Sequence, residues 1–599
     1  MKRLNRTVLS TLGLGVGFGL FAGACGGGGD GTPGSGGSAA LGGSAAGMGG
    51  SGVPGGGSAA VGGNGSPAGG AANPNGGTGP ANGGAIGTDG GSSPGGGSDG
   101  GGGAPPAGGG GTVDGDPIPK PKLITSAAGA FWKTDVEPVA GGTTATITVD
   151  PAMELQDWIG WGGTVNEVGW RELMKLDAAG REAVMKLLVS RVDGLGLTSI
   201  RIPIGASDYA VERYTLCDAP CNAENIETTF SIDHDKDPGH GLIPYIKAAQ
   251  AVVDAEKAQY KGIKDLSFWA SPWTPPPWMK SNNAYDKGVM KNDTDTRKAY
   301  AKYLRMWVEG YEAEGIPIDH IYAQNEPGWA QGYPSCAWGP YTDDGAANTS
   351  TTAFLGNFVA EDLVPELGDK ANVWFGTFSN NTHFPAYWGS LSDKSKVKGT
   401  GLQWETVASV STPVNASITT MQSEHKCGNY PWVSGADNGK NSTAASAEAA
   451  DYNTFWKDWA PNNYNYAVES WGLFKQWVTA GVNGYSAWNM VLDRVGRNLD
   501  EARPWPQNAL ISFKEDGSVN VTPYYYAFRH LTQYAEAGGK RIGVTGGDAL
   551  AFKNPDGSIV VAMYNSGAAA QTTLSIGGTM MQFTVPEKGW ATVNYTPAQ

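Results

Sequence analysis

Residues 296–324, TRKAYAKYLRMWVEGYEAEGIPIDHIYAQ, join an amphipathic stretch to a short apolar run and decide the fold. Apolar residues recur every three or four positions over Thr296–Glu314, which predicts a helix, whereas His320–Gln324 is typical of a buried strand. The same alternation of helix and strand continues on both sides of this stretch. Further helices are expected at Ala178–Val192, Leu242–Ala255 and Thr352–Leu367.

Eight short, β-rich apolar runs follow residue 157, including the one at His320–Gln324. The other seven are Trp158–Gly162, Ser199–Ile204, Leu266–Ser271, Val373–Phe378, Gly401–Trp404, Ile418–Ser423 and Asn483–Trp488. Eight strands separated by helices indicate an α/β protein with a closed (β/α)8 TIM barrel, expected over residues 155–538. An open doubly wound sheet is the alternative, but no Gly-rich phosphate loop follows the first strand.

Alternating apolar and polar residues at both ends of this region predict an all-β side domain. The C-terminal tail, residues 539–599, alternates in Ser558–Tyr564 (SIVVAMY), and a Thr522–Ala537 helix is expected just before it. Thr143–Val149 (TTATITV) shows the same pattern before the barrel. We therefore expect the N-terminal segment, residues 125–154, to add a strand to the C-terminal β-sandwich.

The first 124 residues are expected to lie outside the folded part. Residues 1–24 have a basic start, an apolar run and small residues at the end, as a signal peptide for export has. Cleavage after Ala24 gives a secreted protein. Cleavage before Cys25, which resembles a bacterial lipobox, gives a surface lipoprotein and is favoured because a long Gly/Ser-rich linker, residues 25–124, follows at once.

Charge and cysteine content exclude several classes of function. The net charge of −15 argues against a nucleic-acid partner, whose phosphates require a basic surface. Export permits disulfides, and Cys217 and Cys221 are expected to pair locally, while Cys336 and Cys427 could be paired or free. Because no CxxC pair, histidine cluster or HExxH motif is present in the sequence, no metal site is expected.

Two glutamates follow apolar strands at positions where a barrel carries its chemistry. Glu326 ends the fourth strand and Glu424 ends the seventh, and these strands lie on opposite sides of the barrel mouth. Either glutamate alone could cap a helix or bind an arginine. Together they suffice to hydrolyse a glycosidic bond, because one carboxyl group protonates the leaving oxygen and the other attacks or activates water.

Several ordered segments carry a resemblance to a known family. They are Gly160–Glu167 (GWGGTVNE), Ser199–Tyr209 (SIRIPIGASDY), Phe230–Asp235 (FSIDHD), Ala270–Asn282 (ASPWTPPPWMKSN), Ala323–Pro327 (AQNEP) with Gly332–Cys336 (GYPSC), Gln422–Cys427 (QSEHKC) and Ala487–Asp493 (AWNMVLD). In this order they resemble glycoside hydrolase family 30, in its glucosylceramidase and endo-β-1,6-glucanase-like branch. The resemblance runs from about residue 155 to the C-terminus and implies a retaining β-glycosidase with a β side domain.

The resemblance also implies roles for individual residues. Glu326 falls on the acid/base position and Glu424 on the nucleophile. Asn325 would hydrogen-bond the sugar 2-hydroxyl, a contact that strengthens in the transition state. Arg201 matches a basic residue near the nucleophile, where a cation keeps a carboxylate ionised.

Three further matches concern the −1 sugar subsite. Asp208 is expected to hydrogen-bond the sugar, while Trp273 and Trp488 contribute hydrogen bonds or stacking. One segment, Gln403–Glu405, departs from the family, which often has an aromatic hydroxyl here that supports the nucleophile. Glu405 could point inward as a third acid, or outward, leaving Trp404 as a subsite wall.

The expected substrate is a carbohydrate or glycolipid with a β-glucosidic bond, similar to glucosylceramide or β-1,6-glucan. The alternatives are the same mechanism on β-xylosyl, galactosyl or fucosyl units, and an inactive surface carbohydrate-binding protein. No cofactor is expected, because two carboxyl groups complete the chemistry, and a monomer is expected.

Overall fold

The computed structural model describes residues 117–340, 352–427, 464–493, 496, 498–500, 507–514 and 516–598. The expected signal peptide, Cys25 and nearly all of the Gly/Ser-rich linker lie outside the described residues. Among the described residues, no helix combines the length and apolarity that a membrane span requires.

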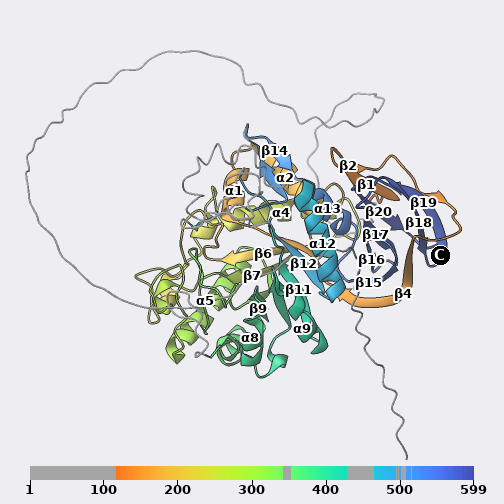
Figure 1. Ribbon diagram of the computed structural model, residues 1–599. Helices are drawn as coiled ribbons and strands as arrows, with labels where there is room; N and C mark the ends of the chain where they lie inside the picture. The colour runs from red at the N-terminus through yellow and green to blue at the C-terminus, as the bar shows by residue number, and fades with distance from the viewer. Residues whose placement is uncertain are drawn as a thin grey trace, which may run out of the picture. The chain divides into compact units, whose positions relative to one another are not determined.

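Eight parallel strands close into a barrel in chain order, which confirms the predicted α/β architecture (Figure 1). Each predicted strand overlaps an observed one. The strands are β5 (Gly160–Thr164), β6 (Ser199–Ile204), β7 (Ser267–Pro272), β8 (Ile318–Tyr322), β9 (Asn372–Phe378), β10 (Gly399–Gln403), β11 (Thr419–Glu424) and β12 (Gly484–Asn489). They are buried along nearly their whole length, as strands covered on both faces are.

Helices and short turns connect these strands. The α-helices are α1 (Glu167–Leu173), α2 (Ala178–Val189), α3 (Ile226–Thr229), α4 (Leu242–Lys257), α5 (Thr294–Ala313), α6 (Leu355–Phe358), α7 (Val364–Leu367), α8 (Phe384–Ser390), α9 (Ser411–Asn415), α12 (Tyr464–Ala480) and α13 (Pro523–Thr532). The short helical turns are η1 (His234–Lys236), η2 (Pro277–Met279), η3 (Val359–Leu363), η4 (Lys394–Lys396) and η5 (Thr406–Ser409).

One predicted helix, Thr352–Leu367, is only partly right. Helical structure begins at Leu355, and the π-turn η3 separates α6 from α7. Pro365 lies in the first turn of α7 and has no N–H to donate, so a regular α-helical hydrogen-bond ladder cannot continue through it. The predicted Thr522–Ala537 helix is capped by Thr522 but ends earlier, at Thr532.

The side domain contains strands from both ends of the described chain. A ten-stranded sheet has the order β2-β1-β20-β17-β16-β15-β4-β18-β19-β3. The strands are β1 (Leu123–Ala127), β2 (Ala130–Lys133), β3 (Val139–Ala140), β4 (Ile147–Trp158), β15 (Gly539–Thr545), β16 (Ala549–Lys553), β17 (Ile559–Tyr564), β18 (Ala570–Ile576), β19 (Thr579–Val585) and β20 (Trp590–Tyr595). A separate hairpin pairs β13 (Ile511–Phe513) with β14 (Val519–Val521).

The N-terminal strand predicted from Thr143–Val149 is present but lies further along the chain, as β4. It pairs antiparallel with β15 and parallel with β18, so it lies between two strands of the C-terminal tail. Figure 1 shows this mixing as orange strands β1, β2 and β4 among the blue strands β15 to β20. The contribution of an N-terminal strand to the side domain is therefore confirmed.

The chain passes directly from β4 into the first barrel strand. Gly160, the first residue of β5, has a φ of +128°, and a Cβ there would lie 2.4 Å from the Thr198 hydroxyl oxygen. Only glycine fits this bend. Trp158 of β4 packs on Trp161 of β5, with ring centroids 4.4 Å apart. This contact fixes the barrel to the side domain at the point where the chain crosses.

The four cysteines of the folded part fall into two kinds. Cys217 and Cys221 form a disulfide in the loop between β6 and α4, as expected. Cys336 and Cys427, for which both states were open, are free thiols and are buried.

Candidate active site

A cavity of about 280 Å³ opens among the residues that follow the barrel strands. Six of the predicted site residues line it, and they come from the ends of five different strands. Arg201 and Trp488 do not line this cavity and lie behind it. The complete lining consists of Asp208, Trp273, Asn325, Glu326, Trp329, Gln331, Tyr333, Ser379, Trp404, Glu405, Glu424 and Gln507.

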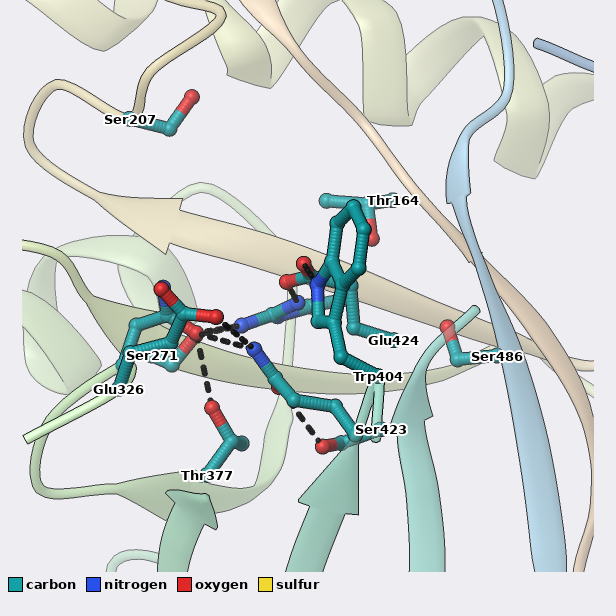
Figure 2. Close-up of polar contacts among 12 residues, drawn as sticks. Thr164, Ser207, Ser271, Glu326, Thr377, Trp404, Ser423, Glu424 and Ser486 are labelled. Atoms are coloured by element: carbon teal, nitrogen blue, oxygen red, sulfur yellow. Dashed lines mark hydrogen bonds and ion pairs between the residues drawn. The ribbon is translucent and has the colours of Figure 1, made fainter. Parts of the chain in front are cut away.

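Glu424, the last residue of β11, is held by one donor at each carboxylate oxygen (Figure 2). The Arg201 guanidinium donates from Nη1 to Oε2, and the Trp404 indole donates from Nε1 to Oε1 at 2.6 Å. Glu424 is only 4% exposed and Arg201 is fully buried, so little water screens their charges. The environment therefore stabilises a carboxylate anion in a fixed orientation.

Arg201, on β6, is itself fixed by polar and aromatic neighbours. Its Nε and Nη2 donate to the Ser271 hydroxyl at 3.1 and 2.9 Å. Its guanidinium carbon lies 4.6 Å from the ring centroid of Trp273 and 5.2 Å from that of Trp488. The two tryptophan rings are stacked, with centroids 5.1 Å apart. Trp488 thus supports Arg201 and Trp273 from behind rather than lining the cavity.

Asn325 has an amide oriented by three donors. Its Oδ1 accepts from Arg201 Nη2 at 2.8 Å, from the Thr377 hydroxyl at 2.8 Å and from Gln403 Nε2 at 3.2 Å. An acceptor so engaged leaves the amide nitrogen as the group that a ligand can meet. Because Asn325 lines the cavity, its N–H groups can donate to a ligand hydroxyl there.

Glu326 occupies a different environment from Glu424. Its backbone has a φ of +47°, held by a hydrogen bond from its own N–H to the Thr377 carbonyl at 2.9 Å. Gln403 Nε2 donates to Oε1 at 3.2 Å, and the Tyr333 hydroxyl lies 3.4 Å from Oε2. Burial, and next the negative charge of Glu424, raise the pKa of Glu326 to about 7. One carboxyl group can therefore carry a proton near neutral pH beside another that is held as an anion.

Asp208 is a third acid in the same cavity. It is 5% exposed, and its Oδ1 has no hydrogen-bond partner among the described residues. Burial raises its pKa well above the usual range, and the charges of Glu424 and Glu326 raise it further. A buried polar atom without a partner is costly in a folded protein, so Asp208 Oδ1 is suited to bind a polar group of a ligand.

The structure decides the orientation of Glu405 in Gln403–Glu405, the segment that departs from the family. Trp404 has a φ of +53°, and its indole N–H supplies the donor to Glu424 described above. The Glu405 side chain is 67% exposed at the edge of the cavity, and its carboxylate binds Lys426 Nζ at 2.8 Å. Glu405 therefore points outward and is not a third acid between the two glutamates.

Several residues of the site were not anticipated as site residues. Thr377 and Ser271 orient Asn325 and Arg201, and Trp329, Tyr333 and Ser379 line the cavity. Trp329 and Tyr333 come three and seven residues after Glu326, so proximity to the acid in sequence was the available signal. The orienting role of Thr377 depends on a strand pairing and has no signal in the sequence.

The donor set favours acid–nucleophile chemistry over metal binding. The described lining of the cavity contains four acids, one of them the outward-pointing Glu405, but no histidine or cysteine, and Arg201 already neutralises Glu424. A metal ion would have to compete with that guanidinium at the same carboxylate. A proton on Glu326 and an anion at Glu424 form the pair that bond cleavage at an acetal carbon requires.

Comparison with known proteins agrees with this arrangement. Residues 159–375 match the glycosyl hydrolase family 30 TIM-barrel domain, and residues 538–593 match the glycosyl hydrolase family 30 beta sandwich domain. The chain is 22% identical over 447 residues to lysosomal acid glucosylceramidase of Mus musculus, covering 71% of this chain and 78% of that one. It is also 22% identical over 454 residues to endo-1,6-beta-D-glucanase BGN16.3 of Trichoderma harzianum, covering 71% and 81%.

A solved structure shares the fold. The endo-beta1,6-glucanase BT3312 superposes with a TM-score of 0.63 at 20% identity, covering 80% of this chain and 99% of that one. Because the match covers 80% of this chain, it extends beyond the barrel into the β side domain.

Proposed function

Because the chain belongs to glycosyl hydrolase family 30 and is a β-glycosidase, we propose that it cleaves β-glucosides with retention of configuration. Glu326 acts as acid/base and Glu424 as nucleophile. The observation that carries the proposal is the contrast between the two carboxyl groups in one cavity: Glu326 has a pKa of about 7, and Glu424 is bound by a guanidinium and an indole N–H.

Each step of a double displacement has a residue suited to it. Glu326 donates its proton to the leaving oxygen while Glu424 attacks the anomeric carbon, which forms a covalent glycosyl-enzyme. Glu326, now ionised, then takes a proton from water, which hydrolyses the ester and returns Glu424 as a carboxylate. The Asn325 amide donates to the sugar 2-hydroxyl, where extra stabilisation develops in the transition state.

The proposed substrates are β-glucosides of the glucosylceramide or β-1,6-glucan type. Relatives with these activities in their names match most of the chain. The cavity offers two tryptophans, Trp273 and Trp404, for the apolar face of a sugar ring, and Asp208 for its hydroxyls. The cavity of about 280 Å³ lies below the size usual for drug-sized ligands, which supports recognition of a small sugar unit at its base.

The stereochemistry of the product tests the mechanism. We expect proton NMR during hydrolysis of an aryl β-glucoside to show the β-anomer of glucose first. A 2-deoxy-2-fluoro glucosyl fluoride should label Glu424, which peptide mass spectrometry can locate. An α-anomeric first product would refute the retaining assignment, and labelling of another residue would refute the choice of nucleophile.

A substrate screen separates the alternatives. Turnover of aryl β-glucosides in preference to β-xylosides, β-galactosides and β-fucosides is expected, followed by cleavage of glucosylceramide or of β-1,6-glucan. Preference for another sugar would keep the mechanism and change the substrate. A folded sample that binds sugars but cleaves none of them would indicate the inactive binding protein.

We also propose that the protein is exported and anchored through lipid on Cys25. The support is the order of a basic start, an apolar run, Cys25 and a Gly/Ser-rich linker. In a detergent phase-partition assay, the parent should enter the detergent phase and Cys25→Ala should remain in water. Equal partition of both into water would instead indicate free secretion.

A further inference from the structure

Glu167, His234 and His240 form a cluster outside the catalytic cavity, called here the Glu167 cluster. Glu167 begins α1, His234 begins η1, and His240 lies two residues before α4. One ligand atom from each residue lies within 4.8 Å of those of the other two. The three residues therefore join α1 to the far end of the long loop between β6 and α4, which carries Asp208 near its start.

The Glu167 carboxylate is already oriented toward the histidines. Its Oε2 accepts a hydrogen bond from the Val211 backbone N–H at 2.8 Å. Its Oε1 lies 2.8 Å from His234 Nε2. Glu167 is 2% exposed, so this carboxylate is removed from water and depends on its neighbours to balance its charge.

A carboxylate lies within hydrogen-bond distance of Nδ1 in His240, and at the longer distance of an ion pair in His234. Asp237 Oδ1 lies 3.0 Å from His240 Nδ1, and Glu212 Oε1 lies 3.9 Å from His234 Nδ1. In His240 a carboxylate that accepts from Nδ1 fixes the tautomer and leaves Nε2 as a ligand, whereas in His234 Nε2 already faces Glu167 Oε1 at 2.8 Å. This pairing of carboxylate and histidine is the usual support of a metal-bound imidazole.

Charge and access at the Glu167 cluster also favour a cation. Asp235, which follows His234, is buried and accepts from the hydroxyls of Tyr214 and Tyr311, each at 2.8 Å. Lys236, the nearest lysine in sequence, is bound by Glu314 at 3.1 Å. The side chains of His234 and His240 are 21% and 28% exposed, so an ion can reach them from solvent.

We propose that the Glu167 cluster binds one Zn²⁺ ion through Glu167 Oε1 and a ring nitrogen each of His234 and His240, with water as the fourth ligand. Two imidazoles and one carboxylate suit Zn²⁺, whereas Ca²⁺ and Mg²⁺ prefer oxygen ligands alone. Zn–N and Zn–O bonds of about 2.0–2.2 Å place tetrahedral ligand atoms roughly 3.3 Å apart. Glu167 Oε1 and His234 Nε2, 2.8 Å apart, would separate slightly, and separations of up to 4.8 Å within the cluster would shorten by at most about 1.5 Å to reach that geometry.

The proposed ion would hold the β6–α4 loop at both of its ends. The Trp170 indole of α1 donates to the Pro238 carbonyl at 2.9 Å, and the Val168 N–H donates to the Tyr209 carbonyl at 3.2 Å. These bonds connect α1 to the residues beside Asp208 and beside His240. A Zn²⁺ ion would add a stronger link in the same place, so its role is to stabilise and position this loop.

Calorimetric titration with ZnSO₄ tests the proposal on the full chain after treatment with EDTA. We expect one Zn²⁺ per chain in the parent and at least a tenfold weaker dissociation constant in His240→Ala. Asp233→Asn is the matched control, because Asp233 lies in the same loop with its side chain 82% exposed. It should bind Zn²⁺ within twofold of the parent. Equal affinity in His240→Ala, or absence of saturable binding in the parent, would overturn the proposal.

Two further readouts do not depend on catalysis. Zn²⁺ should raise the Tm of the parent and of Asp233→Asn but not that of His240→Ala, and Co²⁺ should give the visible absorption bands of a tetrahedral site. His240→Cys keeps a zinc ligand and should retain both effects. An octahedral Co²⁺ spectrum, or an equal rise in Tm for His240→Ala, would contradict the assigned ligands. Zinc binding can be present or absent whether or not the β-glucosidase assignment holds.

Discussion

Replacing Trp404 by phenylalanine should slow turnover by roughly 10- to 160-fold. The change removes the N–H that donates to Glu424 Oε1 at 2.6 Å and keeps an aromatic ring in the cavity. A hydrogen bond to a charged group contributes about 1.5–3 kcal/mol, and about 1.4 kcal/mol corresponds to a factor of ten in rate. The bond from Arg201 to Oε2 remains, so Glu424 keeps its charge partner but is free to rotate.

The loss should appear in a particular step. Trp404 Nε1 stabilises the carboxylate that leaves when the glycosyl-enzyme is hydrolysed, so Trp404→Phe should lower kcat for aryl β-glucosides. Slower hydrolysis of the intermediate should produce a burst of aryl alcohol in stopped-flow measurements. Trp329→Phe is the control, because the Trp329 side chain lines the same cavity without a described hydrogen bond to either carboxyl group, and its backbone N–H bond to the Glu326 carbonyl at 2.9 Å is kept in the variant. It should change KM more than kcat. A kcat within twofold of the parent in Trp404→Phe would refute the reasoning.

Three other predictions concern Glu326, Asp208 and the Cys217–Cys221 disulfide. Because Glu326 must be protonated to act and has a pKa raised to about 7, kcat/KM should fall above pH 7, and Glu326→Gln should lose this alkaline limb on a dinitrophenyl glucoside that needs no proton donor. Asp208→Asn should lower activity yet raise Tm, and more at pH 8 than at pH 5, because a carboxyl with a raised pKa destabilises the fold as pH rises through that pKa. The Cys217–Cys221 disulfide closes only a short loop, so its removal should lower the free energy of unfolding, measured by urea denaturation, by only about 2 kcal/mol. A loss of folding would contradict this prediction.

The barrel could be predicted from the sequence because its buried strands are apolar runs and its helices show apolar residues at helical spacing. Strands such as Ser199–Ile204 are mostly apolar and buried throughout, and in helices such as Leu242–Lys257 apolar residues recur at helical spacing. The π-turn at Val359–Leu363 was not accessible, because it arises from Pro365 within a stretch whose apolar spacing is helical. Strands β1 to β3 were also not predicted, since short strands of this kind take their conformation from the partners they pair with.

Site residues divide in the same way. Glu326 and Glu424 could be predicted because each ends an apolar strand, which fixes its place at the barrel mouth. The donation from Trp404 to Glu424 could not, because it depends on a positive φ that the sequence does not reveal. The Glu167 cluster was hidden by distance along the chain, since Glu167 and His234 are 67 residues apart, and the expectation of no metal rested on local spacing alone.

The interleaving of β4 with β15 and β18, and of β1 with β20, has a consequence for biosynthesis. A nascent chain makes β1 and β4 first, yet their partners β20, β15 and β18 emerge only after the entire barrel has been synthesised. Until then these strands expose unpaired backbone edges, which in other proteins favour aggregation. During synthesis, the side domain can therefore be completed only after the barrel strands have emerged. Chains truncated before residue 539 should be recovered as aggregates, because β1 and β4 then lack these partners. A circular permutant that joins residue 598 to residue 117 places β15 to β20 directly before β1 and β4 in the chain, and it should fold.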